Sequence, residues 1–180
     1  MNDPGAAYRF SWNHLGDIAM ARPHIGADLP VAVYRLMQYT LRHVLADRYG
    51  DEGTRDIMRE AGGLAGEEFC KNLLDTSLAF PEFMAQLQEL FRELRLGILR
   101  VEQANFDTLE MVITVSEDVD CSGLPVLGVT VCDYDEGFLA GVLTCYTGRD
   151  VLVREIDCWA TGDRTCRFDI RPPETPKGKR

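Results

Sequence analysis

The stretch that decides the fold is Val153-Arg-Glu155-Ile-Asp-Cys158-Trp-Ala-Thr-Gly162-Asp-Arg-Thr-Cys166-Arg-Phe168. Two segments of strand-forming residues flank Gly162, and each carries a cysteine four positions from that glycine. In a hairpin that turns at Gly162, Cys158 and Cys166 would lie opposite each other, with Cβ atoms about 4.5–5.5 Å apart. The stretch therefore predicts that strands at 151–158 and 166–170 pair and that both thiols point inward.

Two further side chains extend this pair to a set of four candidate metal ligands, which are Cys132, Glu155, Cys158 and Cys166. Three thiolates and one carboxylate would fill all four positions around a zinc ion, and a filled zinc site is a structural one. Cys132 directly precedes a predicted helix, whose N-terminus favours a thiolate. These residues thus indicate a zinc ion that holds the fold together while other residues carry the function.

Strand geometry places a condition on this site. Cys158 would share a face of its strand with Leu152 and Ile156, whereas Glu155 would lie on the opposite face, because side chains alternate along a strand. A shared metal therefore requires a β-bulge or a strand end near Asp157. The spacing alone also allows the two hairpin cysteines to be plain core residues or to form a cross-strand disulfide.

Apolar periodicity predicts four helices. A period of 3.6 runs over 30–50, 54–74 and 81–97, and again from Cys132 to about Gly148. The second of these helices contains three glycines, and each costs about 1 kcal/mol relative to alanine inside a helix. Their presence indicates that another backbone or a ligand comes close, or that the helix is locally broken. The apolar stripe of the first helix consists of Val33, Leu36, Met37, Leu41, Val44 and Leu45.

The strand pattern completes the predicted fold. A period of two over 99–102 and 109–115 predicts a β-hairpin with one buried face, and residues 8–12 are expected to form a short strand. The fold class is α+β, with helices packed on an antiparallel sheet. We expect a single domain over 1–170, followed by a flexible tail over 171–180.

Composition narrows the classes of partner. The net charge of -10 and the pI of about 4.7 disfavour nucleic acid and anionic membranes. No apolar run approaches the roughly 20 residues that cross a bilayer, and the N-terminus lacks the features of a secretory signal. We therefore expect a cytoplasmic protein, in which the six cysteines serve as core residues or metal ligands rather than as disulfides.

Residues 128–170 resemble the 4-vinyl reductase domain family. The likeness is carried by Val131-Cys132, Glu136-Gly-Phe-Leu-Ala-Gly-Val-Leu143, Glu155-Ile-Asp-Cys158-Trp-Ala-Thr-Gly162-Asp and Cys166-Arg-Phe168. The resemblance implies the fold shared by nitric-oxide-signalling and Golgi-transport proteins, in which helices on an antiparallel sheet enclose an apolar cavity, and it implies a homodimer. In aromatic-sensing activators of this family, three cysteines and a glutamate hold zinc. Residue by residue, that pattern falls on Cys132, Glu155, Cys158 and Cys166.

The resemblance also suggests the kind of ligand. The phenol-sensing members hold the phenol hydroxyl with a histidine and a tryptophan, whereas this chain has apolar residues such as Phe83 and Met111 at roughly equivalent places. This departure favours a small hydrophobic ligand such as a hydrocarbon, a fatty acid or an aromatic. The candidate ligand-binding residues, each of which can also simply fill the core, are Phe83, Leu87, Leu109, Met111, Val142 and Val153.

Two other functions are kept as alternatives. The family name suggests an accessory protein or a reductase in tetrapyrrole (bacteriochlorophyll) 8-vinyl reduction. A reductase needs a hydride source, and the chain has no nucleotide-binding fingerprint, so we expect a binding domain rather than an enzyme. The second alternative is an assembly adaptor without a ligand.

The remaining reactive side chains suggest little chemistry. No catalytic role is assigned to the histidines, although His43 is expected to be partly buried beside the first apolar stripe. The acidic run 117–120 is expected to form a solvated loop, and Cys121 to lie exposed in it. Cys70 and Cys145 are expected to be core residues of helices.

Overall fold

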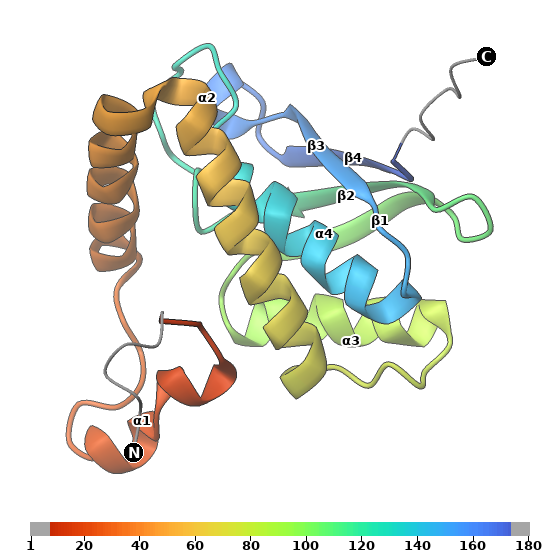
Figure 1. Cartoon of the computed structure of the whole chain (residues 1–180), viewed down its shortest axis with the longest axis horizontal. Helices are drawn as coiled ribbons and strands as arrows, with labels where there is room; N and C mark the ends of the chain where they lie inside the picture. The colour runs from red at the N-terminus through yellow and green to blue at the C-terminus, as the bar shows by residue number, and fades with distance from the viewer. Residues whose placement is uncertain (1–7, 174–180) are drawn as a thin grey trace.

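The computed structural model describes residues 8–173 of the 180-residue chain (Figure 1). Of the predicted tail, Arg171 belongs to the last strand and residues 174–180 lie outside the described part. The elements are, in order, η1 (Trp12–Leu15), α1 (Ile18–Ala21), α2 (Val31–Leu73), α3 (Phe80–Glu93), β1 (Ile98–Asn105), β2 (Glu110–Ser116), α4 (Asp133–Thr147), β3 (Leu152–Asp157), η2 (Trp159–Thr161) and β4 (Cys166–Arg171), where η denotes a 3₁₀ helix.

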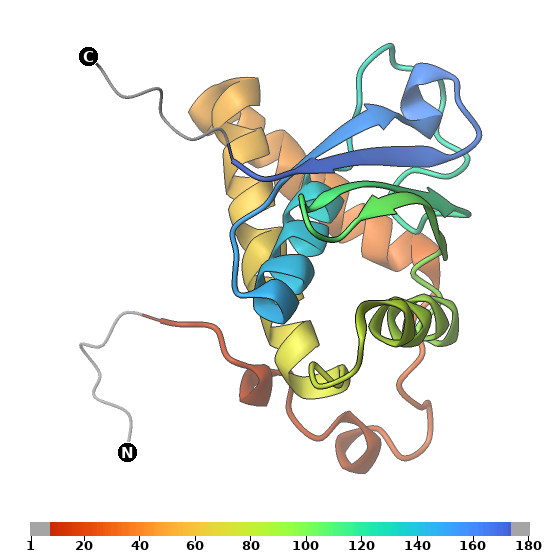
Figure 2. The same cartoon turned by 90° about the vertical axis from the view of Figure 1, so that its right-hand side faces the viewer.

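The four strands form one antiparallel sheet in the order β1-β2-β4-β3. α4 packs against the sheet, the second half of α2 packs against α4, and α3 lies beside β1 (Figures 1 and 2). This arrangement confirms the predicted α+β class with helices on an antiparallel sheet. Within the described residues, no helix combines the length and the apolar character that crossing a membrane requires.

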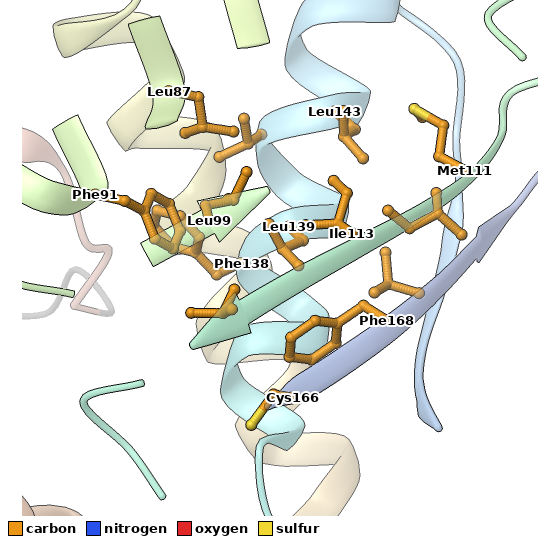
Figure 3. Close-up of a cluster of buried hydrophobic side chains, with 14 of the residues drawn as sticks. Leu87, Phe91, Leu99, Met111, Ile113, Phe138, Leu139, Leu143, Cys166 and Phe168 are labelled. Atoms are coloured by element: carbon orange, nitrogen blue, oxygen red, sulfur yellow. The ribbon is translucent and has the colours of Figure 1, made fainter. Parts of the chain in front are cut away.

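Alternation along β2 decides which face of the sheet is buried. Met111 and Ile113 are at most 2% exposed. They point toward Leu139 and Leu143 of α4, and Phe168 of β4 joins them (Figure 3). Burying a side chain of this size stabilises the fold by about 1.5–3 kcal/mol. The core therefore lies between α4, α3 and the sheet, as the period-two pattern predicts.

The expected strand over residues 8–12 is wrong. Residues 8–11 have no regular structure, and Trp12 begins the η1 turn. Ser11 stands at its N-cap, where its carbonyl oxygen accepts the N–H of His14 at 2.9 Å. The Trp12 N–H donates to Glu68 Oε2 at 3.0 Å, which fixes this segment to α2 instead of to a sheet edge.

α2 joins the first two predicted helices across a kink. Gly50 at the boundary has φ 73° and ψ 173°, a left-handed φ that glycine adopts without the strain of a Cβ. The predicted stop signal at Gly50 is therefore a bend between two helical halves, and hydrogen bonding resumes directly after it.

Glycines allow α2 and α4 to lie almost in backbone contact. A Cβ on Gly62 would lie 2.1 Å from the carbonyl oxygen of Tyr134, and one on Gly66 would lie 2.1 Å from that of Phe138. The helix is unbroken at both positions. Of the alternatives for these glycines, the close approach of another backbone is therefore confirmed.

Candidate metal centre and apolar core

Four cysteine sulfur atoms meet between the start of α4 and the η2 turn. They belong to Cys121, Cys132, Cys158 and Cys166, which are at most 1% exposed, and they all lie within 4.8 Å of one another. Cys132 Sγ is 3.9 Å from Cys158 Sγ and 3.8 Å from Cys166 Sγ. Zinc–sulfur bonds of about 2.3 Å in a tetrahedron would place sulfurs about 3.8 Å apart, so the cluster fits such an ion.

The cluster sits at the edge of the apolar core. Figure 3 shows Cys166 on the strand that carries Phe168, at the end of the row of buried side chains. The neighbouring thiols of Cys121, Cys158 and Cys166 raise the pKa of Cys132 well above its usual value. Several thiolates at this spacing need a cation to balance them. All six cysteines of the chain are free thiols in the structure, so the alternative of a cross-strand disulfide finds no support.

β3 contains the irregularity that a shared metal requires. Its register with β4 shifts between Glu155 and Asp157, which leaves Ile156 as an extra residue that is 53% exposed. The bulge brings Cys158 to the buried side on which Glu155 already lies. The expectation that Cys158 shares a face with Leu152 and Ile156 is wrong for the same reason, because both of those side chains point to solvent.

Glu155 lies beside the sulfur cluster with one oxygen unpaired. Its Oε2 accepts the backbone N–H of Cys132 at 3.0 Å, whereas its buried Oε1 has no hydrogen-bond partner. Burial, followed by the charge of Cys158, raises the pKa of Glu155 to about 8. A buried oxygen without a partner is unusual in a native fold and is a natural contact for an ion. Glu155 is thus a fifth donor next to four sulfurs.

Cys121 is the donor that sequence reasoning missed. The expectation of an exposed cysteine is wrong, because Cys121 is fully buried and its Sγ lies 3.0 Å from Cys166 Sγ. The local fold comes from Asp118, whose Oδ1 accepts the N–H of Asp120 at 2.8 Å and that of Cys121 at 3.0 Å. An aspartate that accepts from the residues two and three positions on forms an Asx turn. The Asp-x-Asp-Cys pattern was the available signal.

The first half of α2 holds this loop through polar side chains. Tyr34 Oη and Gln38 Nε2 donate to Asp120 at 2.7 and 2.6 Å, and the Arg35 guanidinium donates to three backbone oxygens within 118–122. Asp118 and Asp120 are 3% and 1% exposed, so the expectation of a solvated acidic loop is wrong. Burial, and then the charge of Asp120, raises the pKa of Asp118 to about 7.

An ionic network beside the cluster fixes two of the donors. Arg59 of α2 donates to Asp133 Oδ1 at 3.0 Å and to Glu136 Oε2 at 2.5 Å. Glu136 Oε1 in turn accepts the backbone N–H of Glu155 at 2.7 Å. Because Asp133 directly follows Cys132 in the chain, these bonds hold the start of α4 and the middle of β3 in register. The metal donors therefore rest on groups from α2, α4 and β3.

The six candidate ligand-binding residues all belong to the apolar core. Leu87 lies on α3 and Met111 on β2, at opposite sides of the cluster in Figure 3. The ring of Phe83 stacks on that of Tyr146 with centroids 3.9 Å apart. The structure brings the following side chains together at 0–5% exposure: Phe83, Leu87, Leu109, Met111, Val142 and Val153.

A separate pocket of about 500 Å³ opens at the surface between the start of α2 and η2. Trp159 and Arg164 line it, with the guanidinium of Arg164 4.8 Å from the centre of the indole ring. None of the six apolar candidates lines this pocket. His43 is also outside both regions, and its expected partial burial is wrong, since its side chain is 76% exposed.

Comparisons with known proteins place part of the chain in a family. Residues 111–172 match the model of the vinyl-4-reductase domain. The chain is 30% identical over 114 residues to the uncharacterized protein MJ1642 of Methanocaldococcus jannaschii, which covers 63% of this chain and 65% of that protein. It is 26% identical over 119 residues to the uncharacterized protein MJ0150 of the same organism, with 66% and 65% covered. The chain thus spans 65% of the length of each relative.

Three solved structures share the fold at low identity. A vinyl-4-reductase family protein from Methanocaldococcus jannaschii gives a TM-score of 0.60 at 17% identity, covering 93% of this chain and 100% of that one. The phenol-responsive sensory domain of the transcription activator PoxR, solved with phenol, gives 0.59 at 19%, covering 80% and 75%. A trafficking protein particle complex subunit 3 from Naegleria fowleri, covalently bound to palmitic acid, gives 0.62 at 14%, covering 80% and 95%. These likenesses confirm the predicted fold.

Proposed function

We propose that this chain, whose residues 111–172 match the vinyl-4-reductase domain family, is a zinc-stabilised domain that binds a small hydrophobic molecule. The observation that carries the proposal is the apolar core between α3, α4 and the sheet, in the fold of a sensory domain that was solved with phenol. A hydrocarbon, a fatty acid or an apolar aromatic is the expected class of ligand.

The side chains around the core support an apolar ligand. Binding cavities are lined mainly by aliphatic and aromatic groups, with few polar atoms for orientation. Tyr146 supplies a hydroxyl beside Phe83, but that hydroxyl already donates to the Leu78 carbonyl oxygen at 2.9 Å. The rings of Phe80 and Phe106 stack at the same end of the core, and Phe106 is 43% exposed. A ligand would enter there by displacing Phe106.

A fluorescent fatty acid such as cis-parinaric acid tests this function. The folded chain should bind the probe, and a saturated fatty acid or an alkylbenzene should displace it, whereas phenol should not. Leu87→Trp fills the core and should weaken probe binding, while Leu152→Trp, on the exposed face of β3, should not. A folded chain that binds no probe would contradict the proposal. Displacement by protochlorophyllide alone would instead favour the tetrapyrrole-accessory function.

The zinc ion would be held by Cys132, Cys158 and Cys166, with Glu155 or Cys121 as the fourth donor. The sulfur spacing and the unpaired Glu155 Oε1 support this set. The ion would supply folding energy by joining the β3–β4 hairpin to the start of α4. With four protein donors there is no open position for substrate, so the metal's role is structural.

We also propose that the chain acts as one domain over residues 1–170, in the cytoplasm and as a homodimer. One continuous core supports a single domain. Free, buried cysteines suit a reducing compartment. The dimer is what the family resemblance implies.

A further inference from the structure

The first half of α2 presents its apolar face to solvent. Figure 1 shows this half at the edge of the molecule, beyond the half that packs on α4. One row of side chains, called here the outer stripe, faces away from the protein. It consists of Val33 (47% exposed), Leu36 (66%), Met37 (63%), Thr40, Leu41 (51%) and Val44 (44%). Single exposed apolar residues are ordinary, but a continuous row along one helix face marks an interaction surface.

The opposite face of the same half is polar and is fully used inside the protein. Tyr39 Oη donates to the backbone oxygen of Asp120 at 3.0 Å, and Arg42 donates to the Val131 carbonyl oxygen at 3.0 Å. Tyr34, Arg35 and Gln38 bind the same loop, as described above. The helix is therefore fixed in this orientation by its hydrogen bonds, and a rotation that buried the outer stripe would break them.

The outer stripe reads the same from either end. Its residues are spaced by three, one, three, one and three positions, with valine at both ends, Leu36 and Leu41 next, and Met37 and Thr40 at the centre. Two copies packed antiparallel would place Val33 against Val44 and Leu36 against Leu41. A two-fold interface needs one patch that complements itself, and this stripe has that property.

Charge also favours a second copy at this surface. The chain carries 29 acidic residues and a net charge of -10, so most of its faces would repel another copy. From Leu29 to Ala46 there is no acidic residue, and both arginines in that range donate their guanidinium hydrogens to backbone or carboxylate oxygens of the same chain. The outer stripe is thus an uncharged, apolar strip on an otherwise acidic protein.

We infer that the outer stripe is the surface through which two copies of this chain pair, with their α2 helices antiparallel. The inference gives the proposed homodimer a specific contact and does not depend on the ligand or the metal. It also connects the contact to the metal centre, because the helix that carries the stripe holds the loop of Cys121 on its inner side.

The molar mass of the full chain in solution, measured by light scattering over a dilution series, tests this pairing. The wild-type chain should be a dimer. Leu36→Glu should weaken the dimer by about 100-fold or more, because it buries a charge against an apolar partner. Val126→Glu, at a site that is 70% exposed outside the stripe, is the matched control and should leave the dimer unchanged. A monomeric wild type, or a Leu36→Glu variant that stays dimeric, would overturn the inference.

A charge pair tests the antiparallel direction. Leu41→Lys alone should also give a monomer. The double variant Leu36→Glu with Leu41→Lys should recover the dimer at low salt, since each new carboxylate would face the new ammonium of the other copy. Positions five apart on one helix do not face each other, so the recovery cannot come from within a chain. A double variant that stays monomeric contradicts antiparallel pairing. Circular dichroism and zinc content should match the wild type in every variant, which separates this test from that of the ligand and metal.

Discussion

Five donor atoms compete for the four positions that a zinc ion offers. Four are the sulfurs of Cys121, Cys132, Cys158 and Cys166, and the fifth is Oε1 of Glu155. Three of the cysteines are common to every set that fits a tetrahedron, because Cys132 Sγ is 3.8–3.9 Å from the other two. The identity of the fourth ligand is decided between one thiolate and one carboxylate.

Replacing a shared ligand should release the metal and destabilise the fold. For Cys158→Ser we expect less than one zinc per chain and a loss of about 3 kcal/mol or more in the free energy of unfolding, since binding energy of a structural zinc is folding energy. Zinc analysis by atomic absorption and urea unfolding measure the two effects. Cys145→Ser, half-buried on α4 away from the cluster, is the control and should keep its zinc. An unchanged unfolding midpoint for Cys158→Ser would mean that the cysteine is a plain core residue.

The fourth ligand should be revealed by two conservative variants. Glu155→Gln removes the carboxylate and keeps an oxygen that can still accept the Cys132 N–H. Cys121→Ser removes one sulfur and keeps its size. The variant that replaces the true ligand should bind zinc at least about 100-fold more weakly, measured by competition with a chromophoric chelator. Equal affinity in both variants would contradict a site that uses either group.

Sequence reasoning reached three of the four sulfurs and missed one for a physical reason. Cys132, Cys158 and Cys166 sit next to regular elements, so strand and helix spacing locates them. Cys121 is positioned by a turn in which the Asp118 carboxylate accepts backbone N–H groups, and such a turn leaves no periodic signal. The condition near Asp157 was predictable, because alternation alone demanded a bulge that the register of β3 and β4 contains.

At the scale of elements, the crossing of α2 and α4 depends on side chains that are absent. Gly62 and Gly66 of α2 face carbonyl oxygens of α4 at distances that leave no room for a methyl group. Close backbone approach allows the ionic network of Arg59 to reach Asp133 and Glu136 from the neighbouring helix. The metal donors on α4 and β3 are thus set by helix packing as well as by the hairpin.

A pair of glycine variants on one helix measures this packing. Gly66→Ala should destabilise the protein by about 2–3 kcal/mol, because its Cβ would lie 2.1 Å from the Phe138 carbonyl oxygen and force the helices apart. Gly63→Ala is the matched control, since its Cβ would lie 3.9 Å from the Gly137 carbonyl oxygen, an ordinary contact. There the helix propensity of alanine should stabilise by up to about 1 kcal/mol. Thermal unfolding that ranked the two variants in the opposite order would contradict the crossing.

The elements themselves followed from periodicity more closely than their orientation did. The helices, the hairpin and the last two strands lie where period 3.6 or period two places them. The first half of α2 shows why orientation does not follow, because an apolar stripe is read as a core face. Here Leu36 and Leu41 point to solvent, while Gln38 on the other side is buried against Asp120. Polar partners in a distant loop decided the orientation.

At the scale of the whole molecule, the metal centre is where separate parts of the chain meet. It joins the loop of Cys121, the start of α4 and the end of the β3–β4 hairpin. The apolar core continues directly from it along β4, while the outer stripe lies on the other side of the same loop (Figures 1 and 3). Loss of the ion should therefore loosen several elements together.

Counting reactive thiols in the folded chain tests this burial. The zinc-loaded protein at pH 8 should be alkylated by iodoacetamide at Cys145 alone, because the four cluster thiols are buried at the ion and Cys70 is fully buried. Burial, followed by Cys145, raises the pKa of Cys70 to about 12, so its thiol stays protonated and unreactive at pH 8. Tryptic mass mapping identifies the modified sites. Removal of the metal should add cluster cysteines, and rapid labelling of Cys70 before unfolding would contradict the structure.

The most direct single measurement is the mass of the intact chain under native and then denaturing conditions. We expect the native mass to exceed the chain mass by one zinc ion and by an apolar compound retained through purification, and both should be released on denaturation. A native spectrum at the bare chain mass, from protein whose circular dichroism shows it to be folded, would contradict a domain built around a metal and a hydrophobic ligand.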